Sequence, residues 1–331
     1  MNRILQSLSL PAPSTDPANP STPIGTSAGE AVTSVKVGEA SNAFTALLVE
    51  NNQLSLETEV GTNGGTVAYL GRQNIGPCGG QNGQYRFTYS TDGGSTWNVG
   101  AGMNSPGNPP ATGCYGLGPL NPAYFQASRY PNGLLFLPAD SAAQESELAM
   151  IYSGPTLSAT GQGWDGLVVG TSFMDDPANP TQEEYLFVGD SVYFSYSLTE
   201  RVNGEFWFVG AQFNRQTGGA FAFQGDVYVY QGVYNSVSRQ VDWEEKTRLQ
   251  PDYYLGFDGE PNLAGSYAID FSPDGNIGYI AGIADLNGGF DSTFSVWFSE
   301  STDGGATWGE PEEVFLGNSF DLDGYMNFSF F

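Results

Sequence analysis

The chain has 331 residues and a formal net charge of −26, from 36 acidic and 10 basic residues, and it contains no histidine. The acidic balance argues against nucleic acid as a partner, and the lack of histidine excludes Ser-His-Asp and Cys-His nucleophiles and histidine-based zinc sites. No apolar run approaches the about 18 residues that a membrane span needs, so we expect no membrane span.

The first 41 residues are rich in proline, serine, threonine, alanine and glycine. This composition predicts a flexible leader over residues 1–41, followed by a folded domain over residues 42–331. The segment Ile4–Leu10 is too polar and too short for a convincing signal-peptide core.

One eight-residue motif occurs twice in the folded part. Ser90–Trp97 reads STDGGSTW, and Ser301–Trp308 reads STDGGATW. Each copy follows a segment of alternating aromatic and polar residues, which is typical of a strand with two different faces. Asp-Gly-Gly favours a tight turn, because Asp can bond to nearby amides and Gly accepts positive φ. Thr-Trp then begins another strand, so each copy predicts a strand–turn–strand corner.

The pattern Ser-x-Asp-x-Gly-x-Thr-Trp resembles the Asp-box, or BNR repeat, of sialidases and related proteins. The resemblance implies an all-β fold, a β-propeller of four-stranded antiparallel blades, in which the box joins the third and fourth strands on the outer rim. It therefore implies a structural rather than a catalytic role for the box. The box residues are Ser90, Asp92, Gly94, Thr96, Trp97, Ser301, Asp303, Gly305, Thr307 and Trp308.

Blade-like units are predicted at about residues 43–100, 125–172, 185–249 and 264–316, with the start of another at 320–331. Trp164 is expected where the box tryptophan of the second unit would fall. The resemblance implies a ring of about six or seven blades. We therefore expect an incomplete ring from a longer protein, and a small ring closed by the last strand is the alternative.

Two cysteines, Cys78 and Cys114, lie in loops rich in glycine and proline on either side of the first box. Two thiols are too few for a zinc site with four cysteine ligands. A disulfide is favoured over free thiols, and it would imply an oxidising compartment. An extracellular or cell-surface location is expected.

No cofactor is expected to be required, but two loops carry closely spaced oxygen ligands that suit Ca²⁺. Asp285, Asn287 and Asp291 lie in one loop, and Asp321 and Asp323 lie in the other. The alternative is that these side chains cap turns, within an acidic surface that is simply solvated.

Arg72 and Arg129 end or follow inner strands of different units and are candidate ligand-binding residues. The Arg129-Tyr130-Pro131 triplet is similar to the Arg-Ile-Pro motif of sialidases, but its middle residue differs and it follows the first box. A turn leading into a blade is favoured over a substrate-binding arginine. A glycosidase pair of carboxyl groups among Asp165, Asp270 and Asp285 is left open.

Scaffold motifs without an identifiable catalytic set favour a secreted or cell-surface binding module that recognises a glycan or a surface protein. The first alternative is a glycoside hydrolase of the sialidase type, and the second is a scaffold segment of a larger adhesin.

Overall fold

The computed structural model describes residues 34–38, 51–62, 64–72, 85–103, 129–139, 141–157, 164–174, 182–186, 191–202, 204–214, 223–250, 267–284 and 295–315. The chain divides into two compact units, Met1–Lys36 and Val37–Phe331, and the strands among the described residues lie in the second. Within the described part of the chain, no helix is long and apolar enough to cross a membrane.

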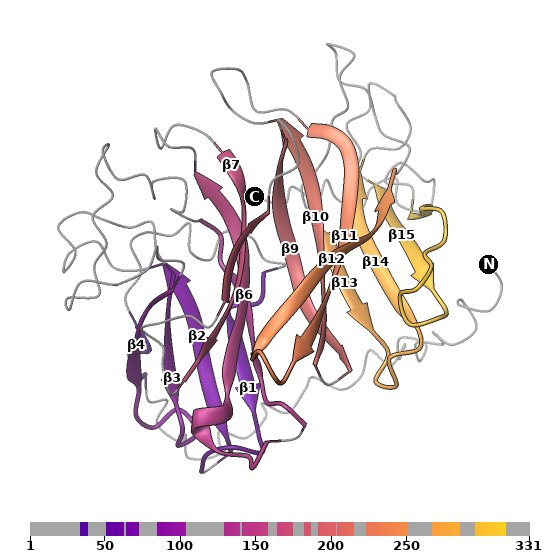
Figure 1. Cartoon of the computed structure of the whole chain (residues 1–331). Coiled ribbons are helices and arrows are strands. Elements are labelled where there is room, and N and C mark those ends of the chain that lie inside the picture. The colour runs from indigo at the N-terminus through magenta and orange to yellow at the C-terminus, as the bar shows by residue number, and fades with distance from the viewer. Residues whose placement is uncertain are drawn as a thin grey trace, which may run out of the picture. The chain divides into compact units, whose positions relative to one another are not determined.

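The first sheet contains β1 (Leu54–Glu57), β2 (Thr66–Arg72), β3 (Tyr85–Ser90) and β4 (Asn98–Met103). The strands are antiparallel and follow one another in chain order, so that each strand pairs with the next (Figure 1). The alternation along β3 has the expected result at Tyr85 and Phe87, which are in the core, whereas Tyr89 is only half-buried and Thr88 is buried as well.

The second sheet contains β5 (Asn132–Phe136), β6 (Ala149–Leu157), β7 (Trp164–Phe173) and β8 (Gln182–Leu186). A single turn of 3-10 helix, Glu145–Glu147, lies between β5 and β6. The sheet has the same antiparallel order as the first. β5 and the central parts of β6 and β7 are buried on both faces, which explains their nearly continuous apolar sequences.

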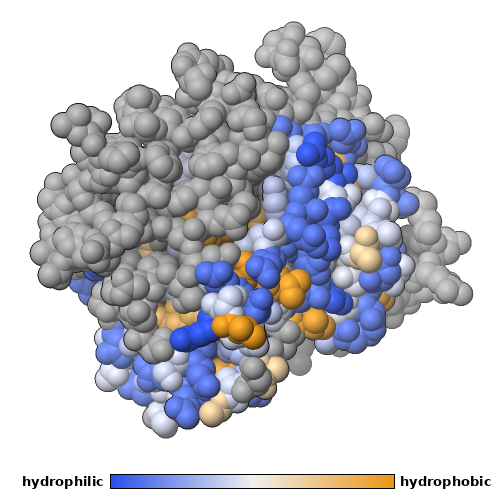
Figure 2. All heavy atoms as spheres, in the orientation of Figure 1, coloured by the Kyte–Doolittle hydropathy of each residue, from blue (hydrophilic) through white to orange (hydrophobic). Residues whose placement is uncertain are grey.

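The third sheet contains β9 (Ser191–Val202), β10 (Glu205–Asn214), β11 (Phe223–Asn235) and β12 (Gln240–Leu249). Its last strand, β12, is polar and exposed over most of its length and forms part of a hydrophilic strip on the surface (Figure 2). Charged side chains on such an edge strand oppose pairing with other chains.

The fourth sheet contains β13 (Tyr267–Phe271), β14 (Gly278–Ala284), β15 (Ser295–Ser301) and β16 (Glu312–Phe315). β13 alternates with period two: Tyr267 and Ile269 are buried, whereas Ala268 and Asp270 are exposed. The strand therefore has one face on the core and one on the surface.

The first strands of successive sheets lie against one another, with β1 beside β5, β5 beside β9, and β9 beside β13. A separate apolar cluster fills the space between each pair of neighbouring sheets. Successive four-stranded sheets that follow the chain and pack face to face in this way form a β-propeller, as the sequence predicts.

The ends of the strands of each sheet form two opposite sides. The first and third strands begin, and the second and fourth strands end, at one of these sides, which we call the Arg72 edge because Arg72 is the last residue of β2. The repeated Ser-Thr-Asp-Gly-Gly turns lie at the opposite edge, which we call the turn edge.

The strand assignment differs from the sequence prediction in the second unit. β8 (Gln182–Leu186) was expected to begin the third unit near residue 185, but it pairs with β7 and is the last strand of the second sheet. Trp164 begins the third strand of that sheet rather than following a box turn. Alternation marks a strand without specifying its partner, so the sequence pattern alone could not separate these arrangements.

Candidate functional site

The two repeated turns have the same internal hydrogen bonds. The Ser90 hydroxyl donates to Oδ1 of Asp92 at 2.7 Å and accepts the N–H of Gly94 at 2.8 Å. The corresponding distances in the second turn, around Ser301 and Asp303, are 2.9 and 2.8 Å. The two glycines of each turn have positive φ, as the turn chemistry requires.

Both carboxylate oxygens of each aspartate accept hydrogen bonds from within the same turn. Asp92 accepts the backbone N–H of Thr96 at 2.8 Å and its hydroxyl at 2.7 Å. Asp303 accepts the same two groups of Thr307, at 2.9 and 2.6 Å. These bonds and the one from Ser90 lower the pKa of Asp92 to about 2. A carboxylate bound in this way serves the turn and is poorly placed to exchange protons with a substrate.

The second turn is also held by its neighbours. A Cβ placed on Gly305 would come within 2.6 Å of the Trp207 ring. The Trp308 ring lies 6.2 Å from that of Trp207, edge to face. In the first turn, by contrast, Trp97 donates from its indole nitrogen to the Gly94 oxygen at 3.0 Å. The tryptophans of the two motif copies, Trp97 and Trp308, therefore anchor their turns differently.

Asparagine residues in the segment before β1 and at the beginning of β5 join the first three sheets. The Asn51 amide donates to the Tyr130 oxygen at 2.9 Å. The backbone N–H of Asn52 donates to Oδ1 of Asn132 at 2.8 Å, and the Asn52 side chain donates to the Leu198 oxygen at 2.6 Å. These bonds fix the segments that lead into β1 and β5.

Arg72 and Arg129 lie near each other at the Arg72 edge. Arg72 pairs with Tyr85 across β2 and β3, and only 1% of its surface is exposed. The Tyr85 hydroxyl donates to the backbone oxygen of Arg129 at 2.5 Å. Desolvation, followed by the positive charge of Arg129, lowers the pKa of Arg72 to about 10. The structure therefore brings together the two arginines that the sequence placed in different units.

Tyr130 completes the cluster. Its φ of 48° makes a sharp bend before β5, so the Arg129-Tyr130-Pro131 triplet forms the expected turn. Burial raises the pKa of its phenol, whereas the charges of Arg129 and Arg72 lower it. We call Arg72, Tyr85, Arg129 and Tyr130 the arginine cluster. Sequence reasoning named Tyr130 only as part of a turn, and it missed Tyr85, because alternation marks Tyr85 only as a core residue.

The chemistry of the arginine cluster suits an anion. Desolvation and the charge of Arg129 disfavour the charged form of Arg72, and a carboxylate bound beside the half-buried Arg129 would favour it. Guanidinium groups also match the planar geometry of a carboxylate, with two parallel hydrogen bonds.

The other sequence candidates do not join this cluster. Asp270 is exposed on β13 and accepts a hydrogen bond from the Thr199 hydroxyl at 3.1 Å. The backbone of Asp165 lies at the beginning of β7, at the Arg72 edge of the second sheet. The candidates outside the described residues are Cys78, Cys114, Asp285, Asn287, Asp291, Asp321 and Asp323. Among the described residues, no group of three or more acidic or cysteine side chains is arranged to hold a metal ion.

No family model matches the sequence, and no curated protein sequence matches it. Among solved structures, the endo-arabinase from Bacteroides thetaiotaomicron VPI-5482 is 13% identical, with a TM-score of 0.44, over 83% of this chain and 85% of that chain. The α-L-arabinofuranosidase from Fusarium graminearum is 11% identical, with a TM-score of 0.43, over 81% and 71%. The phage phi92 endosialidase is 12% identical, with a TM-score of 0.39, over 77% and 35%.

These comparisons correct the leading functional interpretation of the sequence. The similar solved structures are named as glycoside hydrolases, and this finding agrees with the hydrolase alternative and not with the leading interpretation of a non-catalytic binding module. Likeness at such low identity concerns the fold, so the activity of this chain has to be argued from its own residues.

Proposed function

We propose that this chain is a glycoside hydrolase that acts on a glycan bearing carboxylate groups. The observation that carries the proposal is the arginine cluster, where the buried Arg72 lies close enough to Arg129 for the charge of Arg129 to lower the pKa of Arg72. In a chain with 36 acidic and only 10 basic residues, most of the surface repels an acidic glycan. The half-buried Arg129, with the buried Arg72 near it, therefore supplies the local positive charge that such a substrate needs.

The position of the cluster supports a substrate site. It lies at the Arg72 edge, near the segments that lead into the inner strands β1 and β5 of two adjacent sheets. Ligands of folds built from repeated sheets are bound by residues that several neighbouring units contribute. Here the first sheet contributes Arg72 and Tyr85, and the second contributes Arg129 and Tyr130.

Glycoside hydrolysis needs two carboxyl groups, one that protonates the leaving oxygen and one that acts as nucleophile or base. We propose Asp165 and Asp285 as the first residues to test. Asp165 lies on the strand β7 that begins at the Arg72 edge. Asp285 is the next residue in the sequence after β14 and lies outside the described residues, so it is proposed from the sequence alone. Asp270 is a weaker candidate, because Thr199 already bonds to it on the exposed face of β13.

Two further proposals concern the family and the location. We propose that the repeated turns are Asp-boxes, and the support is that both copies share the same serine, aspartate and threonine bonds. We also propose that the protein acts outside the cell, where polymeric acidic glycans are accessible.

The test is hydrolysis of four polymers by the full chain, measured as newly formed reducing ends. The acidic substrates are polysialic acid and homogalacturonan, and the neutral substrates are linear arabinan and β-1,3-galactan. We expect cleavage of an acidic polymer and no cleavage of the neutral ones. Cleavage of only neutral polymers, or of none, would refute the proposal.

Substitutions then locate the site. Arg72→Met keeps most of the side-chain volume and removes the charge, so we expect a loss of about 100-fold or more in kcat/KM. Asp165→Asn and Asp285→Asn should each abolish most of the activity if they form the pair. Arg248→Gln, on the exposed part of β12, is the matched control and should leave the activity unchanged. Equal activities of Arg72→Met and the control would contradict the assignment of the arginine cluster.

A further inference from the structure

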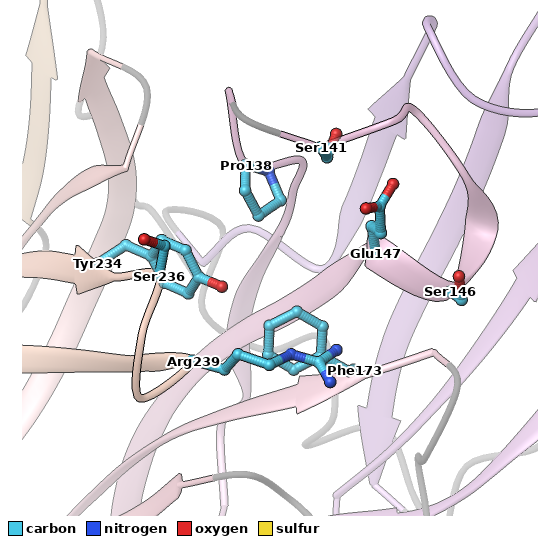
Figure 3. Close-up of a pocket in the computed structure, with 8 residues that line it drawn as sticks. All are labelled: Pro138, Ser141, Ser146, Glu147, Phe173, Tyr234, Ser236 and Arg239. Carbon is cyan, nitrogen blue, oxygen red and sulfur yellow. The ribbon is translucent and has the colours of Figure 1, made fainter.

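A cavity of about 310 Å³ lies at the turn edge between the second and third sheets, away from the arginine cluster (Figure 3). Glu147, from the connection between β5 and β6, and Phe173, at the end of β7, lie on one side. Tyr234 and Arg239 come from the hairpin that joins β11 to β12, on the other side. The cavity therefore combines a cation, a carboxylate and aromatic rings from two sheets.

Arg239 is held over the cavity by an unusual backbone conformation. Its φ of 56° lies in the left-handed region, which glycine or asparagine adopts more easily. The turn before it is fixed by Asn235, whose Oδ1 accepts the N–H groups of Val237 at 3.0 Å and Ser238 at 3.3 Å. As a result the guanidinium reaches the neighbouring sheet and lies 3.7 Å from the centre of the Phe173 ring.

The other polar groups of the cavity are also fixed in place. The Glu147 carboxylate is held in one orientation, because its Oε2 accepts the backbone N–H of Ala142 at 2.8 Å and that of Gln144 at 3.2 Å. The Tyr234 ring lies edge to face with Phe136, at 4.9 Å. Side chains that are already ordered lose little entropy when a ligand binds, so these groups form a preorganised site.

We propose that this cavity binds a single sugar acid. The carboxylate of the ligand faces Arg239, whose planar group can donate to a carboxylate from its edge while its face stays on Phe173. The hydroxyls of the sugar donate to the Glu147 carboxylate, and the Tyr234 ring offers a flat apolar surface. The volume is in the range that holds a small ligand.

This site is independent of the proposed hydrolase activity. The arginine cluster lies at the Arg72 edge, whereas Phe173 ends β7 and Arg239 precedes β12 at the turn edge. Loss of one site should therefore leave the other intact. A chain without hydrolase activity would still bind the sugar acid here, and the two proposals fail separately.

The test is a titration of the full chain with D-glucuronate and, in parallel, with D-glucose, followed by calorimetry or ligand-observed NMR. The two sugars differ at one carbon, a carboxylate against a hydroxymethyl group, so the comparison isolates the contact with Arg239. We expect glucuronate to bind about tenfold or more tightly than glucose. Equal affinities, or no binding of glucuronate, would overturn the proposal.

Arg239→Gly is the sharpest variant, because glycine accepts the left-handed conformation and removes only the side chain. We expect glucuronate affinity to fall about tenfold or more, while thermal unfolding shows a folded chain. If this variant fails to fold, Arg239→Lys replaces it, since lysine keeps the charge but loses the paired geometry, and a smaller loss is expected. Arg248→Gln on the same sheet is the control. Unchanged glucuronate binding in the folded Arg239 variant would refute the site.

Discussion

The Tyr85 hydroxyl donates a hydrogen bond of 2.5 Å to the backbone oxygen of Arg129, and this bond ties the third strand of the first sheet to the segment that leads into the second sheet. Tyr85 is fully buried, and its ring lies edge to face with that of Tyr152 at 6.1 Å. A Cβ on Gly154 would come within 1.7 Å of the same hydroxyl, so only glycine fits there. The backbone of Arg129 is thus positioned by a side chain of the neighbouring sheet.

Removing that hydroxyl should weaken both the fold and the substrate site. Tyr85→Phe keeps the ring but deletes the donor, and we expect a loss of about 1 to 2 kcal/mol in the free energy of unfolding, measured with urea. Hydrolysis of the acidic polymer should fall as well, because Arg129 is less firmly placed. Tyr279→Phe is the control: its hydroxyl bonds to Glu300 on the exposed surface, and the loss should be within about 0.5 kcal/mol. Equal losses in the two variants would contradict this account.

The two turn glycines form a matched pair for a second experiment. Gly94 and Gly305 have nearly the same φ, 90° and 89°. A Cβ on Gly94 meets no atom within 4 Å in the described structure, whereas one on Gly305 meets the Trp207 ring at 2.6 Å. Gly94→Ala should therefore cost about 1 kcal/mol of stability, from backbone strain alone. Gly305→Ala should cost about 3 kcal/mol, because overpacking adds to the strain. Similar losses in denaturant unfolding would show that the contact with Trp207 contributes nothing.

The ion pair of Arg201 and Glu205 lends itself to a double-mutant cycle. Both side chains are partly buried, and Arg201 also donates to the Gly275 oxygen at 3.1 Å. Arg201→Met leaves the Glu205 carboxylate with the Trp207 indole as a donor but without its guanidinium, so we expect a loss of about 2 kcal/mol. The double variant Arg201→Met with Glu205→Leu should lose less than the sum of the single variants, since no charge is left in the site. Strictly additive free energies of unfolding would contradict this coupling.

The turn aspartates should make the fold sensitive to acid. The pKa of Asp92 is lowered to about 2, chiefly by the backbone N–H of Thr96, and the pKa of Asp303 is lowered, chiefly by the Thr307 hydroxyl. A carboxyl with a lowered folded-state pKa stabilises the fold above its unfolded pKa of about 4 and loses that contribution as the pH falls towards 2. Thermal midpoints of the native chain should therefore fall between about pH 4 and pH 2.

The double variant Asp92→Asn with Asp303→Asn checks the origin of that acid sensitivity. It should be less stable than the native chain at neutral pH and should show a flatter dependence of the midpoint between about pH 4 and pH 2. An unchanged slope would place the sensitivity elsewhere, for example at Asp274, whose pKa the Ser272 hydroxyl and Asn276 also lower to about 2.

The fold was accessible from the sequence wherever the determining interactions are local. The turn from Ser90 to Trp97 closes through bonds between residues at most four positions apart, so its residues predict its shape. The alternation along β13 is likewise visible in the sequence. The partner of β8 was not accessible, because its pairing of Leu186 with Leu167 depends on the register of a sheet and not on any local pattern.

The candidate site was accessible only in part. Arg72 and Arg129 stood out in the sequence as rare cations next to inner strands, but nothing in their spacing shows that they approach each other. Their proximity depends on the end of β2 and the segment before β5 meeting at one edge. Tyr85 is similar to Phe87 and Tyr89 in the sequence, and its role depends on a hydrogen bond to another sheet. The cavity of Arg239 and Phe173 likewise joins residues from two sheets.

The first of the two repeated turns needs no neighbouring sheet to keep its shape. All the groups that bond to Asp92 belong to the same short stretch, and the Trp97 indole closes back onto Gly94. From outside the stretch, Thr91 accepts the backbone N–H of Thr62 at 2.7 Å, and Gly93 donates to the Gly65 oxygen at 3.2 Å, both within the first sheet. The corner is therefore a property of a single sheet and its two hairpin loops, and a transplanted copy would have to carry the loop of residues 62–65 with it, whereas the second copy would also leave behind the Trp207 surface against which it packs.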